Sequence, residues 1–403
     1  MDNIPVISNR AARRVFLHLQ GLTIPPHTRL DKQSLLALIH QMGFVQIDSI
    51  NTVERAHHMI LFSRNQTYQP KHLRQLLEDD GALFENWTHD ASIIPASFYP
   101  YWRHKFDREA DQLRERWRTW RREGFEEVLE ETLHHVNRSG PVMSRDFQKP
   151  KQSGEGGGDG WWDWHPQKTA LEYLWRTGDL CVARREGFQK VYDLSHKVIA
   201  DDHFQCRCDH GEFVDWACSS ALDRLGFAAH GEIAAFWDLV SPAEAKVWCE
   251  KLAGNELMQV LVEPADGDKP RLHYAWADCH ELLDEAPEPP ARLRVLSPFD
   301  PVVRDRKRLS RLFGFEYRIE VFVPEAKRQY GYYVFPLIEG GSFVGRIDMK
   351  HDRKTGIMGV RGVWMEPRWK LNDGRLQRLE AELERIRRFT GAEKVVFADG
   401  WRR

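Results

Sequence analysis

The sequence predicts an α+β fold in which three tandem winged-helix units are followed by a small β-rich, barrel-like C-terminal domain. Residues 125–198 read as helix, short helix, helix and β-hairpin, which is the order of elements in a winged helix, and residues 213–276 repeat that order. After residue 290, short segments with strand-like apolar patterns predict strands at 317–323, 330–338, 342–350 and 356–364.

The N-terminal part is expected to follow the same winged-helix plan. A helix is predicted over 8–22 with Ser8 as its N-cap, and a second over 31–42 that ends at Gly43. A long, charge-rich helix is expected over 98–120, and an amphipathic helix over 375–389 closes the chain. The predicted domains are 1–123, 124–210, 211–287 and 288–403, with a proline-rich acidic linker at 286–290.

Composition sets limits on function and location. The 403 residues are 42% hydrophobic and 29% charged, with a formal net charge of −2, so any nucleic-acid site must come from local clusters of Lys and Arg. The N-terminus lacks an apolar signal core, and no stretch approaches the length of a membrane span. The six cysteines are dispersed except for Cys206 and Cys208, which indicates reduced thiols. We therefore expect a cytoplasmic protein with no membrane partner.

Residues 44–50, FVQIDSI, are the candidate catalytic segment. If this short stretch is extended, Gln46 and Asp48 point to one side and Ile47 lies behind them. An amide and a carboxylate placed side by side can hold a water molecule between them. The structural alternative is a strand end at which Asp48 tightens a turn.

The motif Gln46-Ile47-Asp48, followed by Ser49-Ile50-Asn51 and Leu61-Phe62-Ser63-Arg64, resembles the signature of the bacterial winged-helix DNA glycosylases of the YcaQ/AlkZ family. The YcaQ branch is the more similar one, because it carries Gln-hydrophobic-Asp where the AlkZ branch carries Gln-hydrophobic-Gln. Further blocks occur in the same order: Trp87-Thr88-His89-Asp90-Ala91, Gly160-Trp161-Trp162-Asp163-Trp164, Ser297-Pro298-Phe299-Asp300-Pro301, Asp305-Arg306-Lys307-Arg308, Lys327-Arg328-Gln329-Tyr330-Gly331-Tyr332 and Val344-Gly345-Arg346-Ile347-Asp348.

The resemblance implies a monofunctional DNA glycosylase that excises N7-alkylated guanine and unhooks interstrand crosslinks in double-stranded DNA. The chemistry suits the residues, because a cationic N7-alkylguanine leaves readily and the sugar becomes oxocarbenium-like. Asp48 is expected to stabilise that charge and activate water, and Gln46 to hold the water in line. We expect no cofactor and no metal, a monomer, and a bacterial cytoplasmic protein that associates with the nucleoid when bound to DNA.

Basic residues near the C-terminus are candidate DNA contacts. The hairpin tip carries Lys350, His351, Arg353 and Lys354, which suit phosphate binding in a groove, and the resemblance implies that this hairpin touches DNA. Lys327, Arg328 and Arg346 on neighbouring predicted strands extend the same basic surface. The alternatives are a solvated turn and ordinary strand-surface charge.

His89 and Asp90 are candidates for active-site support, since His89 could bind a phosphate or orient water; a lone histidine is otherwise structural. Asp90 replaces a Glu that is common in relatives. His203, Cys206, Cys208 and His210 are metal-ligand types, but their spacing is too short for the usual zinc fingers, and free thiols in a loop are the alternative.

Two other function classes compete with the glycosylase. A non-catalytic winged-helix regulator would have no need of the Gln46-Asp48 pair. A metal-dependent nuclease would need clustered carboxylate ligands that the sequence does not offer.

Overall fold

A computed structural model describes residues 4–119, 124–147 and 166–403. The glycine-rich segment 152–160 and the block 160–164 lie outside these ranges. The chain divides into two compact units: unit 1 comprises Met1–Pro70 and Cys218–Arg403, and unit 2 comprises Lys71–Ala217. The predicted domain 1–123 is therefore shared between both units, and the four smaller domains stay a prediction.

In unit 1 the N-terminal helices form as their local signals require. Ser8 caps α1 (Asn9–Leu19), Asp31 caps α2 (Lys32–Met42), and each cap side chain accepts a backbone N–H three residues later. Gly43 ends α2 with φ 89°, and a Cβ there would lie 2.6 Å from Arg224 Nε and from the Trp237 ring. Only glycine fits at this position, so the chain leaves α2 directly into β2 (Val45–Gln46).

The middle of unit 1 combines helices with a three-stranded sheet in the order β1-β7-β8. β1 (Val6–Ile7) pairs in parallel with β7 (Leu257–Val262), which pairs in antiparallel fashion with β8 (Arg271–Trp276). The helices are α3 (Ala56–Arg64), α10 (His210–Leu225, which begins in unit 2), α11 (His230–Trp237), α12 (Pro242–Leu252), α13 (Cys279–Glu285), α14 (Pro301–Arg304) and α15 (Arg306–Phe313).

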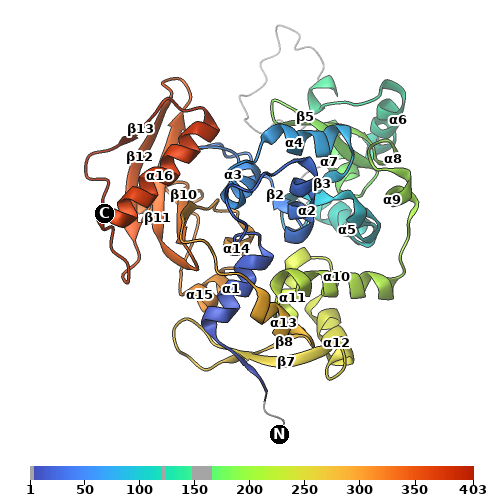
Figure 1. Cartoon of the computed structure of the whole chain (residues 1–403). Coiled ribbons are helices and arrows are strands. Elements are labelled where there is room, and N and C mark those ends of the chain that lie inside the picture. The colour runs from blue at the N-terminus through green and yellow to red at the C-terminus, as the bar shows by residue number, and fades with distance from the viewer. Residues whose placement is uncertain (1–3, 120–123, 148–165) are drawn as a thin grey trace. The chain divides into compact units, whose positions relative to one another are not determined.

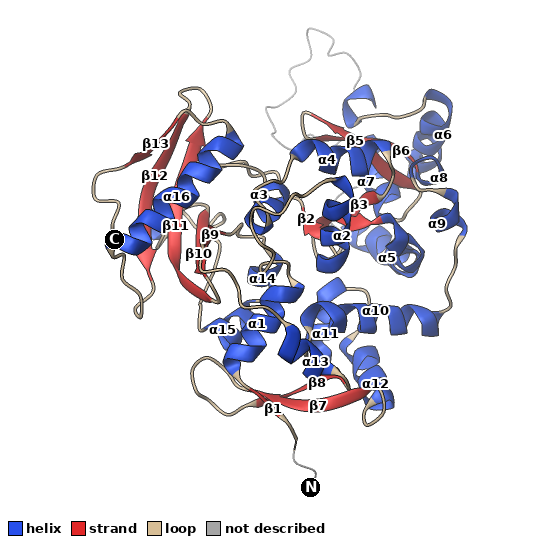
Figure 2. Cartoon of the chain, viewed as in Figure 1, coloured by secondary structure: helices blue, strands red, loops and turns tan. Residues whose placement is uncertain are grey.

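The C-terminal part of unit 1 is a curved, open five-stranded sheet in the order β13-β12-β11-β10-β9 (Figures 1 and 2). β-Bulges at Leu337/Ile338 and Asp348/Met349 add bend and twist. The elements are β9 (Leu293–Val295), the 3₁₀ turn Glu325–Lys327, β10 (Val334–Glu339), β11 (Ser342–Asp352), β12 (Ile357–Met365), α16 (Asp373–Thr390) and β13 (Lys394–Phe397). The β-rich C-terminal domain is thus present as an open sheet, with α16 packed on β9 and β13.

Two of the four predicted C-terminal strands need correction. Residues 317–323 form no strand, and β10 begins at Val334 rather than at 330. The reason is Glu320, whose carboxylate accepts backbone N–H groups from Gln329, Tyr330 and Gly331. These hydrogen bonds replace a strand ladder and fold 318–332 into an irregular loop.

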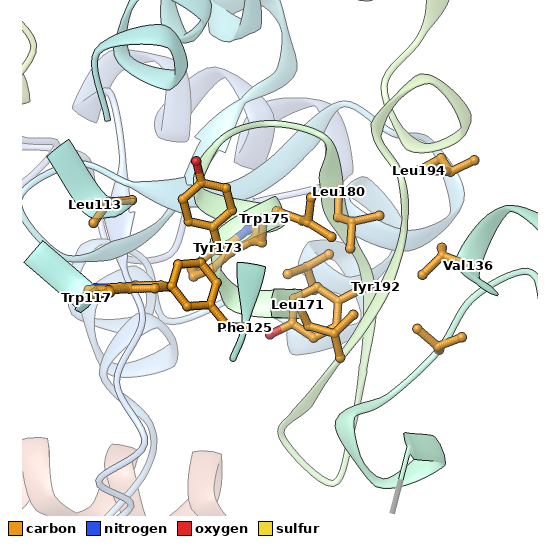
Figure 3. Close-up of a cluster of buried hydrophobic side chains, with 13 residues drawn as sticks. Leu113, Trp117, Phe125, Val136, Leu171, Tyr173, Trp175, Leu180, Tyr192 and Leu194 are labelled. Carbon is orange, nitrogen blue, oxygen red and sulfur yellow. The ribbon is translucent and has the colours of Figure 1, made fainter. Parts of the chain in front are cut away.

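Unit 2 is built around a cluster of aromatic and aliphatic side chains, drawn in Figure 3, that includes Trp117, Phe125, Tyr173 and Trp175. The predicted order of helix, short helix, helix and hairpin is present from α6 to β6. The elements are α4 (Pro70–Arg74), a π-helical turn Gln75–Asp79, β3 (Leu83–Trp87), β4 (Ala91–Pro95), the 3₁₀ turn Ala96–Phe98, α5 (Tyr99–Thr119), the 3₁₀ turn Glu126–Val128, α6 (Leu129–Ser139), the 3₁₀ turn Ser144–Phe147, α7 (Pro166–Arg176), β5 (Leu180–Glu186), β6 (Gln189–Leu194), α8 (Ser195–Val198) and α9 (Asp201–Gln205).

No helix in the described ranges combines the length and apolar character needed to cross a membrane.

Candidate active site and nucleic-acid interface

The candidate catalytic segment is anchored by the residues in front of it. Phe44 is buried, with its ring 5.5 Å from that of Phe236 and 5.8 Å from that of Trp237. Gln46 is also buried, whereas Asp48 is partly exposed. The segment therefore runs from a buried aromatic residue to a carboxylate that is partly accessible to solvent.

Asp48 lies just beyond the end of β2, at a turn. Its Oδ1 accepts a hydrogen bond from the backbone N–H of Ile50 at 2.7 Å, so the turn-tightening role considered from the sequence is present. This hydrogen bond involves one of the two carboxylate oxygens and fixes the orientation of the side chain. The turn and a chemical role are thus compatible in the same residue.

Residues 49–55, here called the motif loop, are held by contacts from both ends. Arg55 Nη1 donates to the Ser49 carbonyl at 3.2 Å, and the backbone N–H of His351 donates to the Thr52 carbonyl at 2.8 Å. These bonds close the loop on itself and tie it to the β11–β12 hairpin.

Arg353 at the hairpin tip adds a clamp to the motif loop. Its guanidinium donates to Asn51 Oδ1 at 2.7 Å, to the Val53 carbonyl at 3.0 Å and to the Asn51 carbonyl at 3.3 Å, and it lies 3.8 Å from a Glu54 carboxylate oxygen. A predicted phosphate ligand thus already binds the loop that follows Asp48. The 300-residue separation in sequence hid this contact.

Other predicted DNA ligands fall into exposed and buried groups. Lys350, Lys354 and Lys327 are exposed, and Arg328 is half-buried, with Nε donating to the Val323 carbonyl at 2.9 Å.

His351 and Arg346 are the buried ones. Burial, and secondarily the positive charge of Arg353, lower the pKa of His351, which favours a neutral ring. Arg346 donates to Glu366 at 2.6 Å and lies over the rings of Tyr330 and Phe315. Its contacts are those of a residue that holds the sheet together.

A buried ion pair joins two of the sequence blocks that carry the resemblance. Arg64 ends α3 and Asp300 caps α14, and both side chains are fully buried. Arg64 Nη2 donates to Asp300 Oδ1 at 2.9 Å, Nη1 contacts Oδ2, and Nε donates to the Gln20 carbonyl at 3.1 Å. Loss of either partner would leave the other charge buried and unpaired, which would destabilise unit 1.

Tyr333 was missed by sequence reasoning. It is buried before β10, 6.0 Å from the Phe299 ring. Burial raises its pKa well above the usual range, and the negative charge of Asp48 raises it further. Tyr333 therefore stays a neutral phenol in the electrostatic field of Asp48. In the sequence, the only indication of a role for Tyr333 is its position directly after the block 327–332, which carries part of the family resemblance.

His89 and Asp90 form the β3–β4 turn in unit 2. Thr88 Oγ1 lies 3.1 Å from His89 Nδ1, and the Ala91 N–H donates to Asp90 Oδ1 at 3.3 Å. Both residues therefore have a local structural role. They belong to the other compact unit than Asp48.

The cysteine-histidine segment of unit 2 shows no ligand cluster. Within the described ranges, no group of three or more His, Cys, Asp or Glu side chains is arranged to hold a metal ion. Cys206 and Cys208 are free thiols, and Cys208 Sγ lies 3.8 Å from the Pro100 carbonyl.

Two comparisons with known proteins place this geometry in context. The sequence model of the family described as "DNA glycosylase AlkZ-like" matches residues 39–389, a span that contains the Gln46-Asp48 segment, the buried ion pair and the hairpin. The chain belongs to the AlkZ-like DNA glycosylase family.

The fold agrees with this assignment. The Streptomyces sahachiroi DNA glycosylase AlkZ matches with a TM-score of 0.64 at 15% sequence identity, over 97% of this chain and 100% of that one. Membership decides among the three function classes in favour of a DNA glycosylase, whose substrate is DNA.

Proposed function

We propose that this glycosylase excises N7-alkylated guanine and unhooks guanines joined as interstrand crosslinks, leaving abasic sites. The observation that carries the proposal is the Gln46-Ile47-Asp48 motif, clamped at the end of β2 in a chain of this family. Alkylation at N7 makes guanine a cationic leaving group. The enzyme then needs mainly to stabilise the oxocarbenium-like sugar and to position water.

Asp48 performs both tasks in this mechanism. Its carboxylate stabilises the developing positive charge near C1′ and accepts a proton as water attacks that carbon. The hydrogen bond from Ile50 holds one oxygen still, so the carboxylate reaches the transition state with little reorganisation. Gln46 donates to the water or the deoxyribose. No lysine nucleophile takes part, so the enzyme is monofunctional.

Arg353 positions the motif loop rather than serving only as a phosphate ligand. Its Nη2 donates to both Asn51 Oδ1 and the Val53 carbonyl, and its Nη1 donates to the Asn51 carbonyl, which fixes the motif loop that follows Asp48. DNA contacts then fall to the exposed Lys350 and Lys354 at the hairpin tip, together with Lys327 and Arg328. Because the hairpin holds both groups, DNA binding at its tip and order in the motif loop are linked.

The remaining assignments follow the family resemblance and the order of elements. The elements from α6 to β6 follow the order helix, short turn, helix and hairpin, and those from α10 to β8 are helices followed by a hairpin. Both orders support winged-helix units that bind double-stranded DNA. The enzyme acts as a monomer in the bacterial cytoplasm, on the nucleoid.

The test is incubation with a duplex that carries one N7-methylguanine, in the presence of a chelator, followed by alkaline cleavage. We expect strand breaks at the lesion that need alkali, and unhooking of an N7-guanine crosslink under the same conditions. Excision of neutral adducts alone, or cleavage without alkali, would contradict the proposed substrate or the monofunctional mechanism.

A further inference from the structure

An apolar ring stands almost wholly in solvent on the loop 318–332 of unit 1. The Phe322 side chain is 95% exposed, whereas the other exposed large apolar residues in the described part of the chain range from 41% to 65%. A single exposed apolar residue needs no explanation by itself. Phe322 differs because the loop that carries it is tightly braced.

Glu320 holds this loop closed. Its Oε1 accepts the Gln329 N–H at 2.8 Å, and its Oε2 accepts those of Tyr330 at 2.8 Å and Gly331 at 3.1 Å. Burial alone would raise the pKa of Glu320, but these three bonds outweigh it and the pKa lies below its usual value. The carboxylate thus stays charged and joins two positions eleven residues apart at the base of the loop.

A second set of bonds fixes the apex. The Val323 N–H donates to the Glu320 carbonyl at 3.0 Å, and Arg328 Nε donates to the Val323 carbonyl at 2.9 Å while its guanidinium lies 5.1 Å from the Tyr332 ring centre. Phe322 therefore lies inside a hydrogen-bonded turn, between two residues whose backbones are held. The ring is presented outward instead of folding back onto the sheet.

The charges on the loop 318–332 and its connection to Tyr333 indicate which kind of partner the Phe322 ring would contact. Three cations lie on the same loop, exposed Arg318 and Lys327 and half-buried Arg328. Of its two acids, Glu325 is exposed and Glu320 is taken up by backbone N–H groups, so the loop keeps a net positive charge. The loop ends at Tyr333, which lies in the field of Asp48. A rigid aromatic ring flanked by cations suits a polyanion with flat apolar faces, which describes stacked bases between phosphates.

We propose that Phe322 is a wedge that enters the DNA base stack beside the damaged guanine, with Arg318 and Lys327 on the flanking phosphates. The inference rests on the proposed glycosylase function and adds the residue that opens the stack. A crosslinked guanine cannot turn fully out of the helix, so kinking by a wedge is the way to expose its C1′.

The test uses a duplex in which 2-aminopurine stands next to N7-methylguanine. Its fluorescence rises when the base unstacks, and single-turnover excision is followed on the same duplex and on one with the lesion in an unpaired bubble. We expect Phe322→Ala to lose the rise and to slow duplex excision roughly tenfold to a hundredfold. Excision from the bubble is expected to stay at the parent rate, and Phe322→Trp to retain both signals. Val247→Ala, an exposed apolar residue on α12, is the matched control.

Three results would overturn the wedge. If Phe322→Ala slowed excision equally on the duplex and the bubble, Phe322 would be a structural residue. If it changed neither the excision rate nor the fluorescence, Phe322 would not contact DNA. A change in sedimentation mass on Phe322→Ala would make the ring a contact between copies. Failure of the proposed function is distinct, because the parent would then excise neither substrate, while the binding-induced fluorescence would still report the wedge.

Discussion

Two aspartates of unit 1, both in sequence blocks that resemble the family, have opposite environments. Asp300 is fully buried, binds Arg64 through both oxygens and also accepts the Val302 N–H at 3.0 Å. Asp48 is partly exposed, and one of its oxygens tightens a turn. Sequence blocks alone do not separate these roles. Burial and hydrogen-bond partners indicate a structural role for Asp300 and are compatible with the catalytic role proposed for Asp48.

The exchange of each aspartate for asparagine tests this contrast most strongly. Asp48→Asn keeps an oxygen for the Ile50 N–H, so we expect an unchanged melting temperature and a loss of about a thousandfold in single-turnover excision. Asp266→Asn is the control, since Asp266 Oδ1 accepts the Asp268 N–H at 3.0 Å in the same kind of turn.

Asp300→Asn is expected to behave in the opposite way. It leaves Arg64 buried without its charge partner, which costs about 3–5 kcal/mol of unfolding free energy. The excision rate of the remaining folded enzyme should stay near that of the parent. Denaturant unfolding and active-site titration measure the two quantities. A stable Asp300→Asn with no activity would reverse the assignment.

Gln46→Ala tests how much Gln46 contributes to the excision rate in comparison with Asp48. Positioning a water contributes less than stabilising charge, so we expect a loss of about a hundredfold in the single-turnover rate. Gln20→Ala is the matched control, because Gln20 is another buried glutamine whose Nε2 donates to the Arg224 carbonyl at 2.9 Å. If Gln46→Ala lost more activity than Asp48→Asn, the roles of the two residues would have to be exchanged.

The hairpin offers a second contrast, between lysines exposed at its tip and an arginine bound to the motif loop. Removing Lys350 and Lys354 together should weaken DNA binding roughly tenfold and reduce the slope of log affinity against log salt by about 1.8, or about 0.9 per lost contact. Lys246→Ala with Lys251→Ala, both exposed on α12, is the control. An unchanged slope would place the DNA elsewhere.

Arg353 is expected to respond differently. Arg353→Lys keeps the charge but loses the guanidinium's set of hydrogen bonds to Asn51 and Val53, so excision should slow about tenfold while the salt slope stays unchanged. Arg353→Ala should slow excision equally. A parental excision rate in Arg353→Lys would show that charge alone matters at this position and that the hydrogen bonds to the motif loop do not affect excision.

Much of the local structure could be predicted because its causes are local. Ser8 and Asp31 cap helices through hydrogen bonds three residues away, and Gly43 supplies the positive φ that ends α2. The strands of the β11–β12 hairpin were predicted from their apolar alternation. These signals span fewer than ten residues, which a sequence displays directly.

The errors came from contacts between distant segments. Residues 317–323 alternate like a strand, yet Glu320 takes backbone N–H groups up to eleven residues ahead. The Arg64–Asp300 pair spans 236 residues and the Arg353 clamp about 300, so neither block revealed its partner. The sequence suggests a surface position for Arg346, which is in fact buried, because burial of a strand face cannot be inferred from one strand alone.

The titration of His58 affects how the pH dependence of excision must be measured, because it changes the stability of the fold. Burial lowers the pKa of His58 to about 4, with Glu54 opposing and Arg55 adding to the shift. The unfolded chain binds that proton near the ordinary value of 6.5, so the unfolding free energy falls as pH drops from about 6.5 towards 4. A melting curve at each pH separates this loss of stability from titration of the chemical step.

The most direct test of the central claim is the single-turnover excision rate of N7-methylguanine as a function of pH. If the ionised Asp48 carboxylate does the chemistry, the rate of the folded enzyme falls on the acidic side only, as that carboxylate takes up a proton, and stays level at alkaline pH. Asp48→Asn should lose the acidic limb. A bell-shaped profile centred near neutrality, or an acidic limb that persists in Asp48→Asn, would contradict the account; His89→Gln would then show whether His89 is the second group.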